Sequence, residues 1–209
     1  MITCGNCLPY LKQTPSASID LAFTDPPYNA KKDYGVSNDD LNDEDYWNQM
    51  REVINELQRV TKRGFGLYTD WKHFQHFWQL IPEAEPIIIY KKSSGFIYSK
   101  HKVMQHHHII LTTATALKPV KSVWDDCRVF GEGYLFNEKK WGHPAQTSLK
   151  ATRRFIEHFS NEDETILDPF MGVGTTAEAC KQLKRNCVGY ETNPQYIKTT
   201  EERLKQQVI

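Results

Sequence analysis

The chain has 209 residues, of which 39% are hydrophobic, and its 26 basic and 26 acidic side chains balance to a formal net charge of zero. This length is enough to bury a core without disulfides, so we expect a single domain over residues 1–209. The neutral charge provides no global attraction to an acidic partner, although a local basic patch still can. The sequence shows no charged-then-apolar leader and no apolar run long enough to cross a bilayer, so we expect a cytoplasmic protein without a membrane segment.

Candidate metal ligands do not form a convincing site. Cys4 and Cys7 have the spacing of a zinc knuckle, but no second Cys pair or His pair completes it. His106, His107 and His108 precede an apolar strand, where successive rings point to opposite faces and cannot converge. We therefore expect no metal. The cysteines are odd in number and lie mostly in apolar surroundings, which is typical of reduced thiols: Cys4, Cys7, Cys127, Cys180 and Cys187.

The predicted elements alternate between strands and helices along the chain. Helical spacing of apolar residues occurs over about 46–60, 149–159 and 193–204, and the last of these helices begins with Asn193 as N-cap. This alternation is typical of an α/β fold with a mostly parallel sheet. Residues 113–142 break the pattern and indicate an inserted lobe. The predicted strands are Ile19–Thr24, Phe65–Tyr68, Ile87–Tyr90, Ile109–Thr113, Thr165–Leu167 and Cys187–Tyr190.

The first of these strands ends in an unusual way. Its apolar residues are too dense for a half-exposed strand, which indicates a strand covered on both faces. It then stops at Asp25, Pro26, Pro27 and Tyr28, because a proline cannot donate a ladder hydrogen bond. Taken alone, the string DPPY is equally consistent with an ordinary Pro-Pro turn at a strand end.

A second strand also ends on Asp-Pro, in the string ILDPFMGVGTTAEAC over residues 166–180. Gly172 and Gly174 allow a tight turn and a close approach to a ligand, and the helix that follows favours a negative group at its N-terminus. Glu191 ends the next strand, twenty-three residues after Asp168. An acidic residue at about this distance takes ribose hydroxyls in nucleotide-binding βαβ units.

Three interpretations of this glycine-rich turn compete. A phosphate-binding P-loop is set aside, because no lysine precedes Thr175 and Thr176. A dinucleotide dehydrogenase matches through Gly172, Gly174 and Ala177, and a turn with only a packing role also remains open. The chain has only eighteen residues after Glu191, so the missing strands must come from its N-terminal part. This places the two Asp-Pro strand ends side by side at the crevice where such sheets bind ligands.

In their joint order, the two motifs resemble the beta group of S-adenosylmethionine-dependent amino-methyltransferases that modify DNA bases. The resemblance implies a Rossmann-like, seven-stranded, mostly parallel methyltransferase sheet with circularly permuted motif order, a small inserted recognition lobe, and S-adenosylmethionine as cofactor. It covers most of the chain through the strings GNC, IDLAFTDPPYN, LQRVTKRGFGLY, HIIL, HPAQTSLKATRRFIEHFSNEDETILDPFMGVGTT and VGYETNPQY.

The resemblance also implies the cofactor-binding residues. The chain departs from the family's pattern at Asn6, where Asp is common near the cofactor's adenine, and at Thr147, where Lys is usual. Its recognition region is short, which does not favour a long recognition sequence. The residues carried over as cofactor-binding are Asn6, Asp168, Pro169, Phe170, Gly172, Gly174, Thr175, Thr176, Glu191 and Asn193.

The chemistry of an exocyclic amine explains the DPPY string. Such an amine is a poor nucleophile, because its lone pair is delocalised into the ring. Asp25 and the carbonyl of Pro26 are expected to accept its hydrogens, while Pro27 fixes the turn and Tyr28 offers a flat face to a flipped base. The family's cytosine enzymes usually carry Ser at this Asp, so we favour N6 of adenine in DNA. Methylation of N4 of cytosine, of an RNA or protein amine, and a catalytically inactive cofactor- or DNA-binding subunit remain alternatives.

A basic stretch suggests where DNA binds. No acidic residue occurs from Pro86 to Trp124, whereas ordinary surfaces mix both signs. We expect this stretch and the adjoining lobe through Trp141 to face double-stranded DNA, with lysines on phosphates. The sequence leaves open the recognition sequence and the oligomeric state, a homodimer included. The lysines concerned are Lys91, Lys92, Lys100, Lys102, Lys118 and Lys121.

Overall fold

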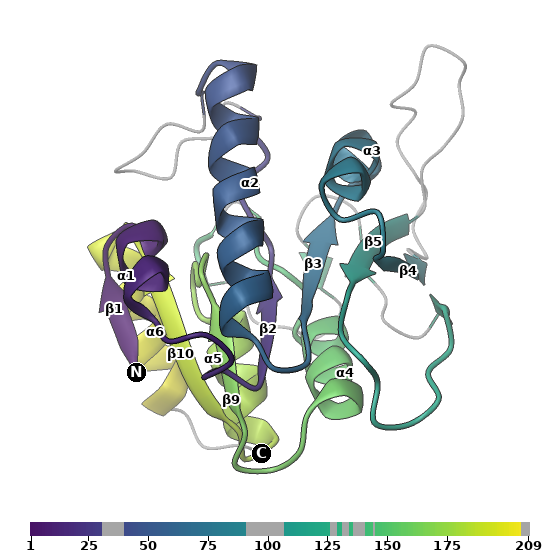
Figure 1. Cartoon of the computed structure of the whole chain (residues 1–209). Coiled ribbons are helices and arrows are strands. Elements are labelled where there is room, and N and C mark those ends of the chain that lie inside the picture. The colour runs from purple at the N-terminus through teal and green to yellow at the C-terminus, as the bar shows by residue number, and fades with distance from the viewer. Residues whose placement is uncertain are drawn as a thin grey trace.

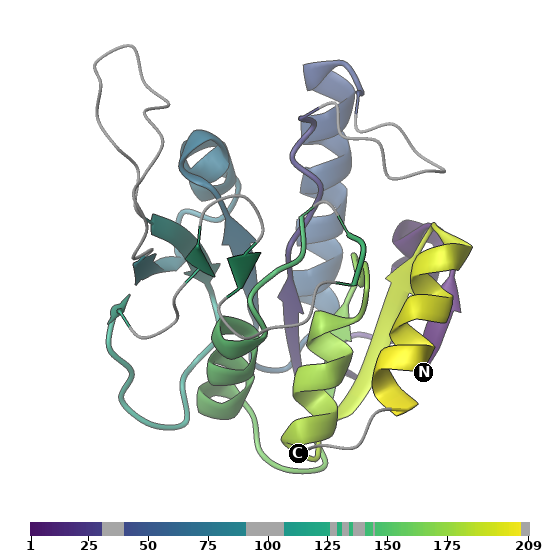
Figure 2. The same cartoon turned by 180° about the vertical axis from the view of Figure 1, so that it is seen from behind.

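The computed structural model describes residues 1–30, 40–90, 107–125, 129–130, 134–135, 141–143 and 145–205, with backbone alone at 129–130 and 134–135. These residues form a three-layer α/β fold, in which helices cover both faces of one central sheet (Figure 1). Helices α1 (Cys7–Gln13), α2 (Asp43–Val60) and α3 (Trp71–Leu80) cover one face. Figure 2 shows α4 (Leu149–Phe159), α5 (Thr175–Gln182) and α6 (Pro194–Lys205) on the other.

The sheet confirms the predicted mostly parallel α/β fold and the side-by-side placement of the two Asp-Pro strands. Its first five strands are parallel, with β2 between β9 and β3, and β5 runs antiparallel to both β3 and β4. The strands in spatial order are β1 (Ile2–Cys4), β10 (Asn186–Glu191), β9 (Thr165–Asp168), β2 (Leu21–Thr24), β3 (Phe65–Thr69), β5 (His107–Thr112), β4 (Glu85–Tyr90) and β6 (Val123–Trp124).

The sheet differs from the prediction in its number of strands. Within the described residues it has eight strands instead of seven. One of them, β6, lies inside the 113–142 stretch that was predicted to be an irregular lobe, and it pairs with β4 as the last strand of the sheet. The same stretch holds a short antiparallel pair of strands, β7 (Val129–Phe130) and β8 (Tyr134–Leu135). Two-residue strands are too short to produce a recognisable period in the sequence.

Strand β2 is buried on both faces, as its dense apolar sequence predicted. Leu21 and Phe23 belong to the core under α4 and α5, while Ala22 belongs to the core under α1 and α2. All three are at most 1% exposed. The predicted helices also form, and Asn193 accepts a 2.9 Å hydrogen bond from the amide of Gln195 at the start of α6. Helices α1 and α3 and strand β1 were not predicted.

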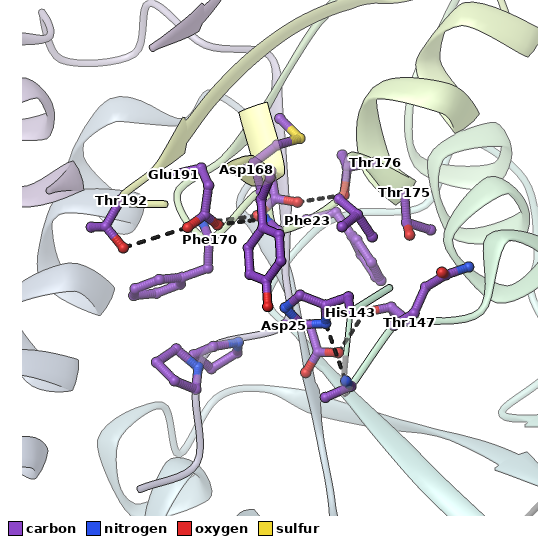
Figure 3. Close-up of a pocket in the computed structure, with 18 of the residues that line it drawn as sticks. Phe23, Asp25, His143, Thr147, Asp168, Phe170, Thr175, Thr176, Glu191 and Thr192 are labelled. Atoms are coloured by element: carbon purple, nitrogen blue, oxygen red, sulfur yellow. Dashed lines mark hydrogen bonds between the residues drawn. The ribbon is translucent and has the colours of Figure 1, made fainter. Parts of the chain in front are cut away.

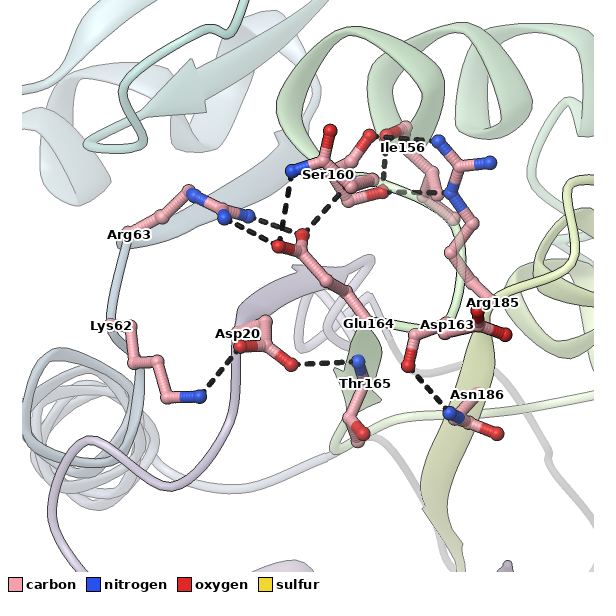
Figure 4. A network of polar contacts seen from close by, with 11 residues as sticks. Asp20, Lys62, Arg63, Ile156, Ser160, Asp163, Glu164, Thr165, Arg185 and Asn186 are labelled. Atoms are coloured by element: carbon pink, nitrogen blue, oxygen red, sulfur yellow. Dashed lines mark hydrogen bonds and ion pairs between the residues drawn. The ribbon is translucent and has the colours of Figure 1, made fainter.

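A polar clamp joins three strands at the amino end of the sheet (Figure 4). The guanidinium of Arg63, just before β3, pairs with the carboxylate of Glu164, just before β9. Asp20, just before β2, accepts hydrogen bonds from the Thr165 amide at 2.9 Å and the Lys62 ammonium at 2.7 Å. The hydrogen bond from Arg63 lowers the pKa of Glu164 to about 2.

This shifted pKa predicts an acid-sensitive stability. The folded pKa lies below the ordinary value of 4.5, so the stabilisation is complete above about pH 4.5 and is lost as the pH falls towards 2. Glu164→Gln should lower the free energy of unfolding at pH 7 by roughly 1 kcal/mol and should flatten its decrease between pH 4.5 and 2. Glu162→Gln is the control, because Glu162 is exposed and lies 3.5 Å from an exposed lysine. Equal pH slopes for the two variants, measured by urea unfolding, would contradict this assignment.

Candidate active site

Two adjoining cavities open where the parallel strands β2, β9 and β10 end. The first has a volume of about 120 Å³ and is lined by Asp25, Asp168 and the glycine-rich turn. The second has a volume of about 280 Å³ and is lined by residues of α1 and α2. The two share a wall made by Pro27, Phe170, Glu191 and Thr192. Together they make up the cleft at the carboxyl edge of the sheet, which is the usual ligand site of such sheets.

The glycine-rich turn has the backbone geometry that its sequence predicted. Gly172 and Gly174 adopt positive φ angles of 53° and 78°, which residues other than glycine rarely adopt. A Cβ atom on Gly174 would lie only 2.3 Å from Cγ2 of Thr200, so α6 packs directly against the turn. Gly174 is also the N-cap of α5 and has no side chain to cap it. No side chain of the cap residue therefore binds the first amides of the helix.

Glu191 holds this turn in place. Its Oε2 accepts a 2.8 Å hydrogen bond from the amide of Gly172, and its Oε1 accepts one of 2.8 Å from the amide of Asn193. The carboxylate therefore clamps the turn to the end of β10 while it lines both cavities. Figure 3 shows Glu191 and Thr192 on one side of the cleft and Asp25, His143 and Thr147 on the other.

Asp168 is the buried acid of the site. It is 4% exposed, and its carboxylate accepts hydrogen bonds from the Thr176 hydroxyl at 2.5 Å and the Phe170 amide at 3.0 Å. Burial raises the pKa of Asp168 to about 7, and the nearby charge of Asp25 adds to this increase. A carboxyl group in this state gains most from a positively charged ligand, because that charge would compensate its ionised form.

Asp25 follows the end of β2, and both of its carboxylate oxygens accept hydroxyl hydrogen bonds. The hydroxyl of Tyr28 donates to Oδ1, and that of Thr147 donates to Oδ2 at 2.5 Å. The Tyr28 ring stacks on His73 with 5.1 Å between centroids. The turn itself is fixed from α2, because the Tyr46 hydroxyl donates a 2.8 Å hydrogen bond to the carbonyl of Pro27.

Comparison with known proteins identifies the family. The model of the DNA methylase family for N6 and N4 enzymes matches residues 19–81 and 68–202, which together are most of the chain. The chain belongs to the DNA methylase family. It is 27% identical over 241 residues to the DNA adenine methyltransferase YhdJ of Escherichia coli, an alignment that covers 96% of this chain and 81% of YhdJ.

Solved structures share the fold. The crystal structure of an M1.HpyAVI–SAM complex superposes with a TM-score of 0.71 at 22% identity and covers 99% of both chains. The cytosine-N4-specific PvuII DNA methyltransferase superposes with a TM-score of 0.75 at 17% identity, covering 100% of this chain and 87% of that enzyme. These matches show that the methylase has the Rossmann-like methyltransferase fold.

Most of the predicted cofactor residues lie around the cleft of the methylase. Asn6 caps α1 by accepting a 2.9 Å hydrogen bond from the Leu8 amide, and it lines the second cavity. Asn193 lies at the start of α6 beside Glu191. The remaining predicted residues line one or both cavities: Asp168, Pro169, Phe170, Gly172, Thr175, Thr176 and Glu191. Gly174 shapes the turn between them.

The predicted DNA-binding lysines divide into two groups. Lys118 and Lys121 are exposed on the segment between β5 and β6, where the Leu117 amide donates to the carbonyl of His158 near the end of α4. That segment leaves β5 at the amino end of the sheet, which is the end opposite the cleft (Figure 1). The other four lie outside the described residues: Lys91, Lys92, Lys100 and Lys102.

Three residues of the site received no role from the sequence. Thr147 was noted only as a departure from the family's pattern, and the structure places its hydroxyl on Asp25. His143 lines the first cavity, and its ring packs edge-on against Tyr196 with 4.8 Å between centroids. The signal for Thr147 and His143 was the string HPAQTS, which contributed to the resemblance without a function for its members. Tyr196 had only been assigned to the last helix.

Neither a metal site nor a membrane segment appears in the part of the chain that the structure describes. No three His, Cys, Asp or Glu side chains gather there in a way that would hold a metal ion. His107 and His108 of β5 contact different aromatic rings, those of Trp71 and Tyr68. None of the described helices has both the length and the apolar composition needed to cross a membrane.

The raised pKa of Asp168 predicts that this residue costs stability at neutral pH. The unfolded chain releases the proton near pH 3.8 and the folded chain keeps it up to about pH 7, so stability falls as the pH rises between these values. Asp168→Asn should remove this fall and raise the free energy of unfolding at pH 8 by 1 kcal/mol or more. Thermal unfolding from pH 4 to 8 measures the effect, and exposed Asp125 changed to Asn serves as the control. A variant less stable than the wild type throughout this range would overturn the assignment.

Proposed function

We propose that this methylase transfers a methyl group from S-adenosylmethionine to N6 of adenine at a specific site in double-stranded DNA. The observation that carries the proposal is the placement of Asp25 in the same cleft as the glycine-rich turn. A hydrogen-bond acceptor for an amine and a binding turn for a nucleoside-like cofactor thus share one cavity. A catalytically inactive subunit would have no need of this arrangement.

The donor set of the cleft fits S-adenosylmethionine. The cofactor carries a sulfonium and an ammonium group, and buried Asp168 is a carboxyl group whose ionised form needs a nearby positive charge. Glu191 would bind the ribose hydroxyls through the lone pairs that its bonds to the turn leave available. Two adjoining cavities suit a ligand with an amino-acid end and an adenosine end. When bound, the cofactor supplies an electrophilic methyl group.

The residues of the DPPY turn would prepare the target amine. Asp25 and the carbonyl of Pro26 accept the two amine hydrogens, which favours a more pyramidal nitrogen with a localised lone pair. The amine proton becomes strongly acidic only after methyl transfer, so Asp25 acts mainly by position and charge. The prolines and the Tyr46 hydrogen bond fix this geometry before the substrate arrives, which lowers the entropic part of the barrier.

Two observations favour adenine over cytosine. The cytosine enzymes of the resembled group usually carry Ser where this chain has Asp25, and the 27% identical relative YhdJ is named a DNA adenine methyltransferase. The likeness to the cytosine-N4-specific PvuII enzyme concerns the fold alone, so it does not favour cytosine. Methylation of N4 of cytosine is the second candidate, and one nucleoside analysis distinguishes it from methylation of N6 of adenine.

Residues 91–106 hold four lysines of the basic stretch, and the position of the two strand ends that flank them supports a DNA-facing role. This segment begins after Tyr90 and ends before His107, two residues that pair with each other at one end of β4 and β5. That end lies at the same edge of the sheet as Asp25, since Ile109 of β5 pairs with Thr69 at the carboxyl end of β3. Phosphate contacts by its four lysines would position the duplex over the cleft.

We also propose that the methylase acts in the cytoplasm. The proposal makes no choice between a monomer and a homodimer.

The function is tested with labelled S-adenosylmethionine and DNA of mixed sequence, followed by digestion and nucleoside analysis. We expect label in N6-methyladenine; label in N4-methylcytosine alone would favour the second candidate. Asp25→Ala should bind the cofactor with unchanged affinity in a thermal-shift titration, yet lose on the order of a hundredfold or more in turnover. Near-normal turnover of this variant would contradict the proposed mechanism.

A further inference from the structure

We infer that Thr147 is a positioning residue that holds one oxygen of the Asp25 carboxylate and thereby leaves the other oxygen to accept the target amine. This inference rests on the proposed function and concerns a residue at which the chain departs from the family's pattern. The two oxygens are bound by hydroxyls of different kinds, Oδ1 by Tyr28 and Oδ2 by Thr147. The oxygen that accepts the amine is the one whose hydroxyl donor can be displaced.

Thr147 is fixed by its position directly before α4. The next residue, Ser148, caps this helix by accepting a 3.3 Å hydrogen bond from the Ala151 amide, and it is 2% exposed. The Ser148 carbonyl accepts from both the amide and the hydroxyl of Thr152, at 3.0 and 2.9 Å. The backbone that carries Thr147 is therefore held by the start of a packed helix, and its 2.5 Å bond to Oδ2 is part of the rigid scaffold.

The Tyr28 hydroxyl has a second acceptor. It lies 3.1 Å from the carbonyl oxygen of Tyr68, so its proton can turn to that oxygen when Oδ1 is taken by another donor. An incoming amine can therefore replace Tyr28 at Oδ1 without leaving the Tyr28 hydroxyl unsatisfied. Oδ1 is the exchangeable oxygen of Asp25, and Oδ2 is the anchored one.

Residues shortly before Thr147 in the chain also contact the glycine-rich turn or a residue bound to it. Nε2 of His143 would lie 3.5 Å from a Cβ atom on Gly172, and the Trp141 ring lies 5.8 Å from the Arg203 guanidinium. Arg203 in turn donates a 3.3 Å hydrogen bond to the carbonyl of Val173 in the turn. Residues 141–147 thus connect Asp25 with the glycine-rich turn. This connection would set the position of Asp25 relative to a cofactor bound at the turn.

The uncharged hydroxyl has a consequence for the chemistry. It orients the carboxylate by donating a hydrogen bond, and it brings no opposite charge next to Asp25. Thr147 therefore fixes the direction of the carboxylate without forming an ion pair with it.

The test compares Thr147→Val, which keeps the shape and removes the hydroxyl, with Thr147→Ser, which keeps the hydroxyl. Thr115→Val is the matched control, since Thr115 is exposed and hydrogen-bonds through its backbone to Arg63 at the far end of the sheet. We expect Thr147→Val to lower kcat roughly ten- to a hundredfold through misplacement of Asp25, with cofactor affinity within twofold of the wild type. Thr147→Ser should restore kcat, because it returns a hydroxyl donor to Asp25.

A double variant separates this role from a merely structural one. In the Asp25→Ala background, Thr147→Val should cause no further loss of kcat, because its effect passes through Asp25. A multiplicative loss, or a loss of cofactor affinity in Thr147→Val alone, would overturn the inference. Thr147→Ala replaces Val if thermal unfolding shows that Val destabilises the fold. A wild-type protein that methylates no DNA would instead refute the proposed function, whereas full activity of both hydroxyl-free variants would refute only the role of Thr147.

Discussion

The parallel pairing of β2 with β9 is the contact on which the site depends. Leu21 lies opposite Ile166 and Ala22 opposite Leu167, so two strands that are separated by more than a hundred residues end at the same edge of the sheet. Both strands are covered by helices on both faces, which makes their apolar side chains a strong restraint on register. Asp25 and the glycine-rich turn are then neighbours because backbone hydrogen bonds place the ends of these two strands side by side.

The cleft gathers three carboxyl groups, and the structure treats each of them differently. Glu191 is satisfied by two backbone amides, and Asp25 by two hydroxyls. Asp168 is buried most deeply, and its pKa rises to about 7 because its hydrogen bonds do not compensate for lost hydration. A site of this kind is least stable in isolation and most stable with a cation present. This electrostatic demand agrees with a positively charged methyl donor, and it places the destabilised acid where the cofactor would bind.

Much of the fold was predictable because the relevant signals are local. The apolar density of residues 19–24 indicated burial on both faces, and the prolines and glycines marked where strands end and turns begin. Short elements escaped, since β1 and β6 have three and two residues and show no period. Lys118 also illustrates the limit: its charge was visible in the sequence, but the antiparallel course of β5 places it at the end of the sheet opposite the cleft.

The sequence by itself determined the residue types of the site, the order of its two motifs, and the backbone freedom that Gly172 and Gly174 provide. These features depend on intrinsic conformational limits and on neighbours along the chain. Only the tertiary structure decided that the Thr147 hydroxyl meets Asp25, because this contact joins residues 122 positions apart and requires α4 to pack against β2. It likewise decided the pKa of Asp168, since that value depends on how completely other elements exclude water from its carboxyl group.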